Sequence, residues 1–118
     1  MSEQRPEWAI EFYVDAQGRS PVVELLASLP AQERAKVRNA LRLLNEFGVL
    51  LQMPHARAMT GHPKLWELRA GAVRLFYFAQ VGHRFVILHG FRKKSSRAPR
   101  HEIAVAERRM AEVVGREE

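Results

Sequence analysis

The chain of 118 residues contains no cysteine, which excludes disulfide bonds and thiolate metal sites. No apolar run approaches the roughly 18 residues that a membrane-spanning helix needs. The N-terminal segment MSEQRPEW lacks the apolar core of a signal peptide. Together with a hydrophobic content of 47%, these absences predict one soluble domain, residues 1–118, located in the cytoplasm without a membrane partner.

Acidic residues are absent from a long stretch of the second half. Between Leu68 and His101 there is no Asp or Glu, although the chain holds 13 of them in total. Residues 1–59 hold seven basic and seven acidic residues, whereas residues 60–118 hold twelve basic and six acidic ones. The whole net charge of +6 therefore lies in the second half. This clustering predicts a polyanionic partner, nucleic acid before a membrane surface.

The first half of the chain predicts one strand and two helices. Trp8–Val14 is rich in aromatic and β-branched residues, which favours a strand. Pro21–Ser28 predicts a short helix, because the preceding serine can cap it and proline suits its first position. Ala31–Phe47 carries apolar residues at three- and four-residue steps, so it predicts an amphipathic helix. Val49–Gly61 is expected to be an irregular connection.

The second half predicts three strands and a helix. The strands are Lys64–Ala70, Ala72–Val81 and Arg84–Gly90, and short glycine-containing turns join them into hairpins. A helix follows, opened by Ala98-Pro99 and ended by Gly115. The order β-α-α-β-β-β-α predicts a compact α+β domain whose helices pack on an antiparallel sheet of about four strands.

Two arginines stand on either side of the first of these hairpins. We expect Arg69 and Arg74 to converge on one patch of the sheet. A guanidinium can hold two phosphate oxygens and keeps its charge, so we predict that the pair clamps a phosphate, with Arg92 assisting. Lys93 and Lys94 follow Arg92 directly. Neighbouring cations lower the pKa of a lysine, which makes this pair candidates for proton transfer.

Other candidates have a structural alternative beside the functional one. His89, Tyr77 and His101 could transfer protons, but they could equally be a packed strand residue, a core aromatic and a helix cap, respectively. Three further cations, Lys64, Arg97 and Arg100, are predicted to bind RNA or the ribosome through salt-dependent phosphate contacts. No metal site is predicted, since His55 and His62 lack a third ligand.

Three motifs carry a resemblance to a known family. They are Leu-Trp-Glu-Leu-Arg at 65–69, Arg-Leu-Phe-Tyr-Phe at 74–78 and His-Gly-Phe-Arg-Lys-Lys at 89–94. In this order and spacing they resemble the RelE/HigB toxin superfamily, and within it the phage-derived, HigB-type subgroup of phage gene-product-49-like proteins. The resemblance extends over nearly the whole chain and implies a RelE-like fold.

The resemblance also implies a function. It is that of a toxin of a type II toxin–antitoxin module, a ribosome-dependent endoribonuclease that cleaves mRNA by metal-independent attack of the 2′-hydroxyl and needs no cofactor. The implied partners are mRNA in the ribosomal A site, rRNA and a cognate helix-turn-helix, HigA-like antitoxin. By position, Arg69 and Arg74 match basic residues of the family's sheet, and Arg92–Lys94 match its basic loop.

The chain departs from the family pattern at two positions. Glu67 stands where better-known RelE members carry a lysine used in catalysis, and His101 lies near the place of a C-terminal tyrosine. The general acid and base therefore stay unassigned. Two alternatives share the fold: a ParE-like toxin that poisons DNA gyrase, and a basic RNA-binding module without catalysis.

Overall fold

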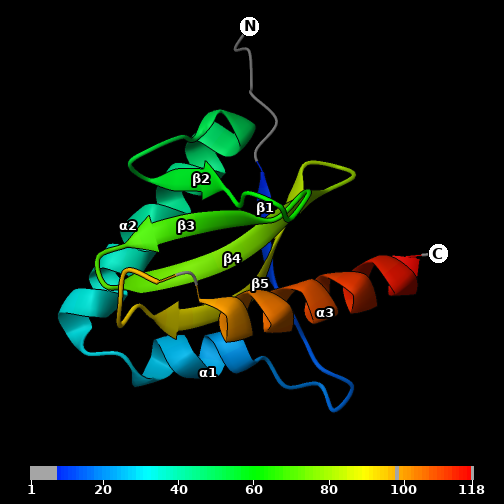
Figure 1. The fold of residues 1–118 in the computed structure, drawn as a ribbon, viewed down its shortest axis with the longest axis horizontal. Helices are drawn as coiled ribbons and strands as arrows, with labels where there is room; N and C mark the ends of the chain where they lie inside the picture. Colours follow the sequence, from blue (N-terminus) through cyan, green and yellow to red (C-terminus); the bar gives the residue numbers. More distant parts are fainter. Residues whose placement is uncertain (1–7, 98, 118) are drawn as a thin grey trace, which may run out of the picture.

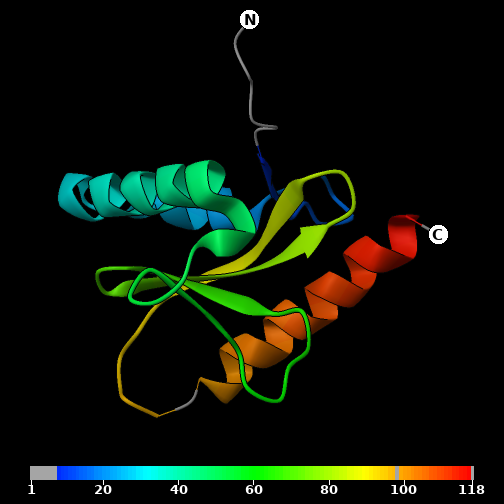
Figure 2. The ribbon, with the colours of Figure 1, turned by 90° about the horizontal axis from the view of Figure 1, so that it is seen from above.

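The computed structural model describes residues 8–97 and 99–117. Within them a sheet carries helices on both faces (Figures 1 and 2). Helices α1 (Pro21–Ser28) and α2 (Ala31–Phe47) cover one face, and α3 (Arg100–Glu117) crosses the other. A short 3-10 turn, Gly48–Leu50, follows α2 directly. The predicted α+β class is confirmed.

The sheet has five strands in the order β1-β5-β4-β3-β2. Their bounds are β1 Ala9–Phe12, β2 Ala56–Ala58, β3 Trp66–Ala70, β4 Val73–Gln80 and β5 Arg84–Arg92. The first strand runs parallel to β5, and all other neighbouring pairs are antiparallel. The order places the two longest strands, β4 and β5, in the interior of the sheet.

The expectation of about four strands falls one short. Strand β2 lies within the segment that the sequence predicted to be irregular. Its three residues, Ala-Arg-Ala, show no alternating apolar pattern. It forms because it pairs with β3, from Ala56 opposite Leu68 to Ala58 opposite Trp66. A partner distant in the sequence thus defines this strand.

Element boundaries differ from prediction by a few residues. Helix α3 continues past Gly115 to Glu117, because a glycine inside a helix costs only about 1 kcal/mol. The last turn is also held from outside: Arg116 donates to the carbonyl of Val14 at 2.9 Å. Strand β5 extends beyond Gly90 to Arg92, which pairs with Val73.

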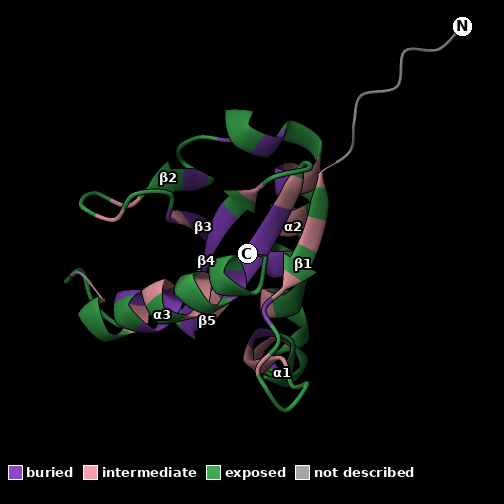
Figure 3. Cartoon of the chain, turned by 90° about the vertical axis from the view of Figure 1, so that its right-hand side faces the viewer, coloured by how far each residue is buried: buried purple, intermediate pink, exposed green. Residues whose placement is uncertain are grey.

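The sheet separates two apolar cores (Figure 3). Alternate strand residues point to opposite faces, so each strand contributes to both. The core under α1 and α2 contains Leu68, Leu75, Tyr77 and Ile87 with Val22, Val37 and Leu44. The core under α3 contains Leu65, Phe76, Phe78 and Leu88 with Ile103, Ala106 and Val113. Strand β4 is buried over most of its length, which makes it the central strand of the domain.

Polar contacts fix α3 on its face of the sheet. Arg109 donates to the carbonyl of Leu88 at 2.9 Å, and its guanidinium lies 5.0 Å from the centre of the Tyr13 ring. The Tyr13 hydroxyl in turn donates to Glu112. These contacts join α3 to β5 and to the segment after β1. They hold the middle of α3 against the sheet.

We predict that Gly48→Ala lowers the free energy of unfolding by about 1–3 kcal/mol, measured by urea denaturation. Gly48 has φ +56° and ψ −131°, a combination that side chains rarely adopt. A Cβ there would also lie 2.1 Å from the indole nitrogen of Trp8.

Gly115→Ala is the matched control. Nothing lies within 4 Å of its added Cβ, and the residue is helical. Alanine should therefore stabilise the protein by roughly 0.5–1 kcal/mol. Equal effects of the two substitutions would contradict the assignment of strain to Gly48.

Candidate nucleic-acid interface

The turn between β3 and β4, the end of β5 and the start of α3 gather at one end of the sheet (Figure 1). The turn consists of Gly71 and Ala72, and Gly71 has φ +64°. A glycine at the first central position suits a two-residue hairpin turn. The backbone nitrogen of Lys93 donates to the carbonyl of Ala72 at 2.8 Å. The hairpin therefore holds the start of the basic loop in place.

Arg69 and Arg74 are direct partners across the β3–β4 ladder. Since strand residues alternate, they share the sheet face with Glu67 and Phe76, the face that α3 covers further along. The predicted convergence of the two arginines is confirmed. Their depths differ, however: Arg69 is partly exposed, whereas Arg74 is only 7% exposed.

The buried Arg74 is held by the hairpin itself. Its Nη1 donates to the carbonyl oxygens of Gly71 and Val73, the latter at 3.1 Å. Its Nε lies 3.9 Å from Glu67 Oε1 and makes no hydrogen bond within the part of the chain that the structure describes. Burial lowers the pKa of Arg74, and the charge of Arg69 lowers it further, while Glu67 opposes both. Arg74 therefore contributes positive charge from beneath the surface.

Glu67 is the central acid of this cluster and is 1% exposed. Its Oε1 accepts a hydrogen bond at 3.0 Å from Nε of Arg57, which lies directly opposite it on β2. Sequence reasoning missed Arg57, because a residue in a segment without a predicted strand cannot be assigned to a face. We call Arg57, Glu67, Arg69 and Arg74 the arginine cluster.

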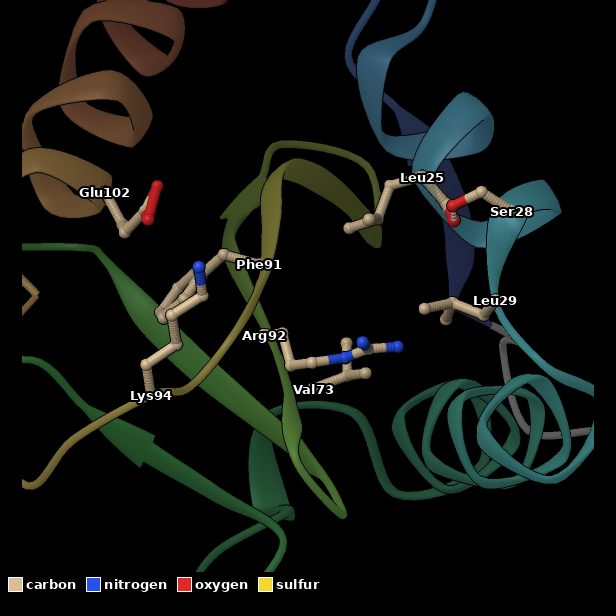
Figure 4. A pocket seen from close by; sticks show the side chains of 8 residues that line it. All are labelled: Leu25, Ser28, Leu29, Val73, Phe91, Arg92, Lys94 and Glu102. Atoms are coloured by element: carbon tan, nitrogen blue, oxygen red, sulfur yellow. Dashed lines mark hydrogen bonds between the residues drawn. The ribbon is translucent and has the colours of Figure 1, made fainter.

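Arg92 does not join the arginine cluster. It lies opposite Val73, whose side chain belongs to the core under α1 and α2. Its guanidinium forms an ion pair with Glu33 of α2. In Figure 4 it points toward Leu29 across a hollow of about 440 Å³. Arg92 thus points away from Arg69 and Arg74, so the structure does not support the expectation that it assists their clamp.

A bulge in β5 explains where Arg92 points. The ladder pairs Phe76 with His89 but Tyr77 with Ile87, so β5 carries one additional residue, Leu88, between them. Both Leu88 and His89 lie on the α3 side, where Leu88 joins the core and His89 contacts the helix. The alternation after the bulge is reversed, which turns Arg92 to the opposite face.

The segment from Lys93 to Arg97 forms the basic loop, which leaves the sheet on the α3 side (Figures 1 and 2). Together with the start of α3 it surrounds a hollow of about 290 Å³. The polar residues lining this hollow are Arg92, Lys93, Lys94, Ser95, Arg97, Arg100, His101 and Glu102. Within the part of the chain that the structure describes, Lys93, Lys94, Arg97 and Arg100 form no ion pair.

Glu102, the acid in this hollow, is held by His89. The His89 Nε2 lies 2.8 Å from Glu102 Oε1, and Nδ1 lies 3.2 Å from Nη1 of Arg109. An arginine can only donate, so Nδ1 is the acceptor and the ring proton sits on Nε2, donated to Glu102. Burial lowers the pKa of His89, while Glu102 opposes the shift. With Nδ1 as an acceptor the ring is neutral, and it orients the carboxylate.

The remaining predicted residues lie in different surroundings. Tyr77 is 3% exposed in the core under α2, and burial raises its pKa, so its hydroxyl does not reach the interface. His101 is exposed in the first turn of α3. Lys64 is exposed just before β3, at the end of that strand away from the hairpin, and so lies apart from Arg97 and Arg100.

Residues 8–97 and 99–117 lack two features, a metal-binding cluster and a membrane-spanning helix. No group of three or more His, Asp or Glu side chains in this part of the chain is arranged to hold a metal ion. None of the helices described there is long and apolar enough to cross a membrane.

Comparison with known proteins places the chain in a family. The family model described as "Phage derived protein Gp49-like" matches residues 24–111. The chain belongs to this phage-derived Gp49-like family. Its fold is similar to that of a chain in the crystal structure of the archaeal RelE–RelB complex from Pyrococcus horikoshii OT3, with a TM-score of 0.57 and 20% identity. That similarity covers 77% of this chain and 98% of the other.

No curated protein sequence matches this member of the Gp49-like family. The predicted membership of the phage gene-product-49-like proteins is confirmed by the family match, and the RelE-like fold is confirmed by the structural similarity.

The neutral His89 predicts how the stability of this Gp49-like protein depends on pH. Because burial lowers the pKa of His89 below its ordinary 6.5, the unfolded chain binds a proton more readily than the folded one. The stabilising contribution of His89 is complete above pH 6.5 and should be lost as the pH falls below it. We expect His89→Gln, which cannot be protonated, to show a shallower loss of stability in urea titrations between pH 7.5 and 5.

His55→Gln serves as the control, because His55 is exposed in the turn before β2, away from α3. It should retain the pH dependence of the parent protein. The account of His89 is wrong if the His89→Gln and His55→Gln proteins have the same pH profile.

Proposed function

We propose that this chain is the toxin of a type II toxin–antitoxin module and acts as a ribosome-dependent endoribonuclease. Membership of the phage-derived Gp49-like family and the RelE-like fold support the toxin assignment. The nuclease assignment is argued from the charge distribution at one end of the sheet.

The observation that supports the nuclease assignment is an excess of unpaired positive charge at one end of the sheet. Two acids at this end are paired with arginines, Glu67 with Arg57 and Glu33 with Arg92, and Glu102 accepts a hydrogen bond from the neutral His89. The loop cations, by contrast, face solvent around the hollow without an ion pair among the described residues. Such a surface favours a phosphate backbone, because each neutralised phosphate releases counterions.

Cleavage without a metal requires three events. The 2′-oxygen loses its proton and bonds to phosphorus, the bond from phosphorus to the 5′-oxygen breaks, and the 5′-oxygen takes up a proton. The products are a 2′,3′-cyclic phosphate and a 5′-hydroxyl. In this proposal Arg69 stabilises the charge on the phosphate oxygens, since a preorganised guanidinium is suited to that role.

We assign proton transfer to groups that line the hollow. Lys93, Lys94 and His101 supply donors, and Glu102, oriented by His89, supplies an acceptor. Arg97 and Arg100 contribute salt-dependent docking to ribosomal and messenger RNA, and Lys64 is a separate docking contact.

The proposed protein partner is a cognate antitoxin of the helix-turn-helix class, which would silence the toxin. The archaeal complex similar in fold pairs RelE with RelB. Co-expression of the neighbouring small open reading frame should restore growth in cells that produce this chain.

The function is tested by inducing the chain in cells and mapping RNA 5′ ends by primer extension. The proposal predicts growth arrest with new ends spaced by codons within translated reading frames. DNA damage without such ends would favour gyrase poisoning instead, and normal growth with intact mRNA would favour a binding module.

We predict that Arg69→Ala lowers the rate of mRNA cleavage by about 10²- to 10³-fold, as for the loss of another preorganised donor. Arg69→Lys should be intermediate, because the charge stays but the two-pronged geometry is lost. The rate is measured with purified protein, programmed ribosomes and end-labelled mRNA.

Arg38→Ala is the control, since it removes the same charge from an exposed position on α2. It should cleave like the parent protein. Comparable losses in Arg38→Ala and Arg69→Ala would mean that overall charge, rather than the interface, controls the rate.

A further inference from the structure

The arginine cluster contains a residue that neither the motifs nor the family match single out. We infer that Arg57 binds a phosphodiester group of the RNA next to Arg69, and that the buried Glu67 is the positioning residue that holds Arg57 for this contact. The inference rests on the proposed function and extends its binding surface from the β3–β4 hairpin onto β2.

The four side chains of the arginine cluster lie on three neighbouring strands. Arg57 faces Glu67 across the β2–β3 ladder, and Arg69 follows Glu67 by two residues, so all three share one face of the sheet. Arg74 lies opposite Arg69 on the same face. Three neighbouring strands thus place three arginines on the face that carries Glu67, and two of them lie 3.0 and 3.9 Å from its carboxylate.

The arginine cluster has more positive than negative charges. A fully buried carboxylate needs partners, and Glu67 obtains one from Arg57 at 3.0 Å and a weaker one from Arg74 at 3.9 Å. One acid among three arginines leaves two positive charges uncompensated. Burial lowers the pKa of Arg74 most, and the charges of Arg69 and Arg57 lower it further, so both lie within electrostatic reach of Arg74. The cluster therefore favours an anion at its surface.

The arginine cluster also contains a donor that is left unpaired within the described part of the chain. Arg74 Nε is buried, points to the Glu67 side of the cluster and has no hydrogen-bond partner among the described residues. Its side chain is 8% exposed, so Arg74 adds charge from below without reaching a ligand directly. A ligand anion above it would face Arg57 and Arg69, which are the accessible members.

Arg57 is suited to reach such an anion. Its side chain is 45% exposed, and only its Nε is used by Glu67. A guanidinium has four further N–H donors, which can form a two-pronged contact with phosphate oxygens. Because Glu67 fixes the inner edge of the group, the outer edge is preorganised toward solvent.

Arg69 is held beside the turn that leads into β2. Its backbone nitrogen donates to the carbonyl of His55 at 2.8 Å, and its Nη1 contacts Met53 Sδ at 3.7 Å. The same turn continues into Ala56 and Arg57. Backbone hydrogen bonds thus join the segment that contains Arg57 to the strand that contains Arg69. These bonds fix the separation between the two backbone positions.

An RNA phosphodiester fits this site better than an acidic protein segment. Paired guanidiniums match the fork of phosphate oxygens, and the cluster lies at the same end of the sheet as the basic loop. A phosphate backbone can contact both surfaces in succession. A carboxylate-rich partner is the competing occupant, and the experiment below distinguishes the two.

The test is binding of a fluorescent single-stranded RNA with 2′-O-methyl groups, which cannot be cleaved, measured by anisotropy over a range of salt. We expect Arg57→Ala to bind about tenfold more weakly, as for the loss of one charge-assisted hydrogen-bonded contact. The slope of log affinity against log salt should also decrease by about 0.7. Arg38→Ala, with the same change in charge, should bind like the parent protein.

Glu67→Gln tests the positioning role, because loss of the charge and loss of the positioning change the RNA affinity in opposite directions. The loss of a negative charge alone would tighten RNA binding. If Glu67 acts by orienting Arg57, binding should weaken instead, and the Arg57→Ala/Glu67→Gln double variant should bind no more weakly than Arg57→Ala. Tighter binding by Glu67→Gln would overturn the positioning role.

Should Glu67→Gln fail to fold, Arg57→Lys gives an independent measure. It keeps the charge but loses the fork, so its affinity should lie between those of the parent protein and Arg57→Ala. Arg57→Ala with unchanged RNA affinity and salt slope overturns the inference, whether or not the protein cleaves mRNA. The same result with loss of antitoxin binding would assign the cluster to an acidic protein partner. A parent protein that binds this RNA through Arg57 but never cleaves mRNA would refute the proposed function alone.

Discussion

The ion pair between buried Glu67 and Arg57 is the contact on which the basic end of the molecule depends. A carboxylate that is only 1% exposed is tolerated only when its charge is compensated. Arg57 of β2 and Arg74 beside the hairpin provide this compensation for Glu67. The acid that departs from the family pattern is thus the centre of a cluster that remains positive. Its presence organises the cations around it and leaves two of their charges available.

The rest of the fold keeps this end accessible. Helices α1 and α2 cover one face of the sheet and α3 crosses the other (Figure 1). On the α3 side, Arg57 is exposed and Arg69 partly exposed. Arg109 fixes α3 through Leu88 and Tyr13, while the backbone of Lys93 is tied to the hairpin at Ala72. The loop between them is therefore anchored at both ends. Its cations surround a hollow, and Glu102, held by His89, lines it.

Sequence patterns predicted the features that depend on local periodicity or on direct pairing across a short turn. Those include α2, the strands from β3 to β5, and the position of Arg69 opposite Arg74. Sequence patterns failed where a contact with a distant part of the chain determines the local structure. Strand β2 has no apolar pattern and exists only through β3, so Arg57 was overlooked. The bulge at Leu88 has no sequence signal either, and it alone turns Arg92 to the opposite face.

The central claim is that the chain cleaves mRNA on the ribosome with basic side chains as its charge stabilisers. The most direct measurement is incubation of the purified protein with ribosomes translating a labelled mRNA, followed by chemical analysis of the fragment ends. The account predicts cuts inside codons, only when ribosomes are present, with 5′-hydroxyl and 2′,3′-cyclic phosphate ends. Intact mRNA, or fragments that carry 5′-phosphates, would contradict it.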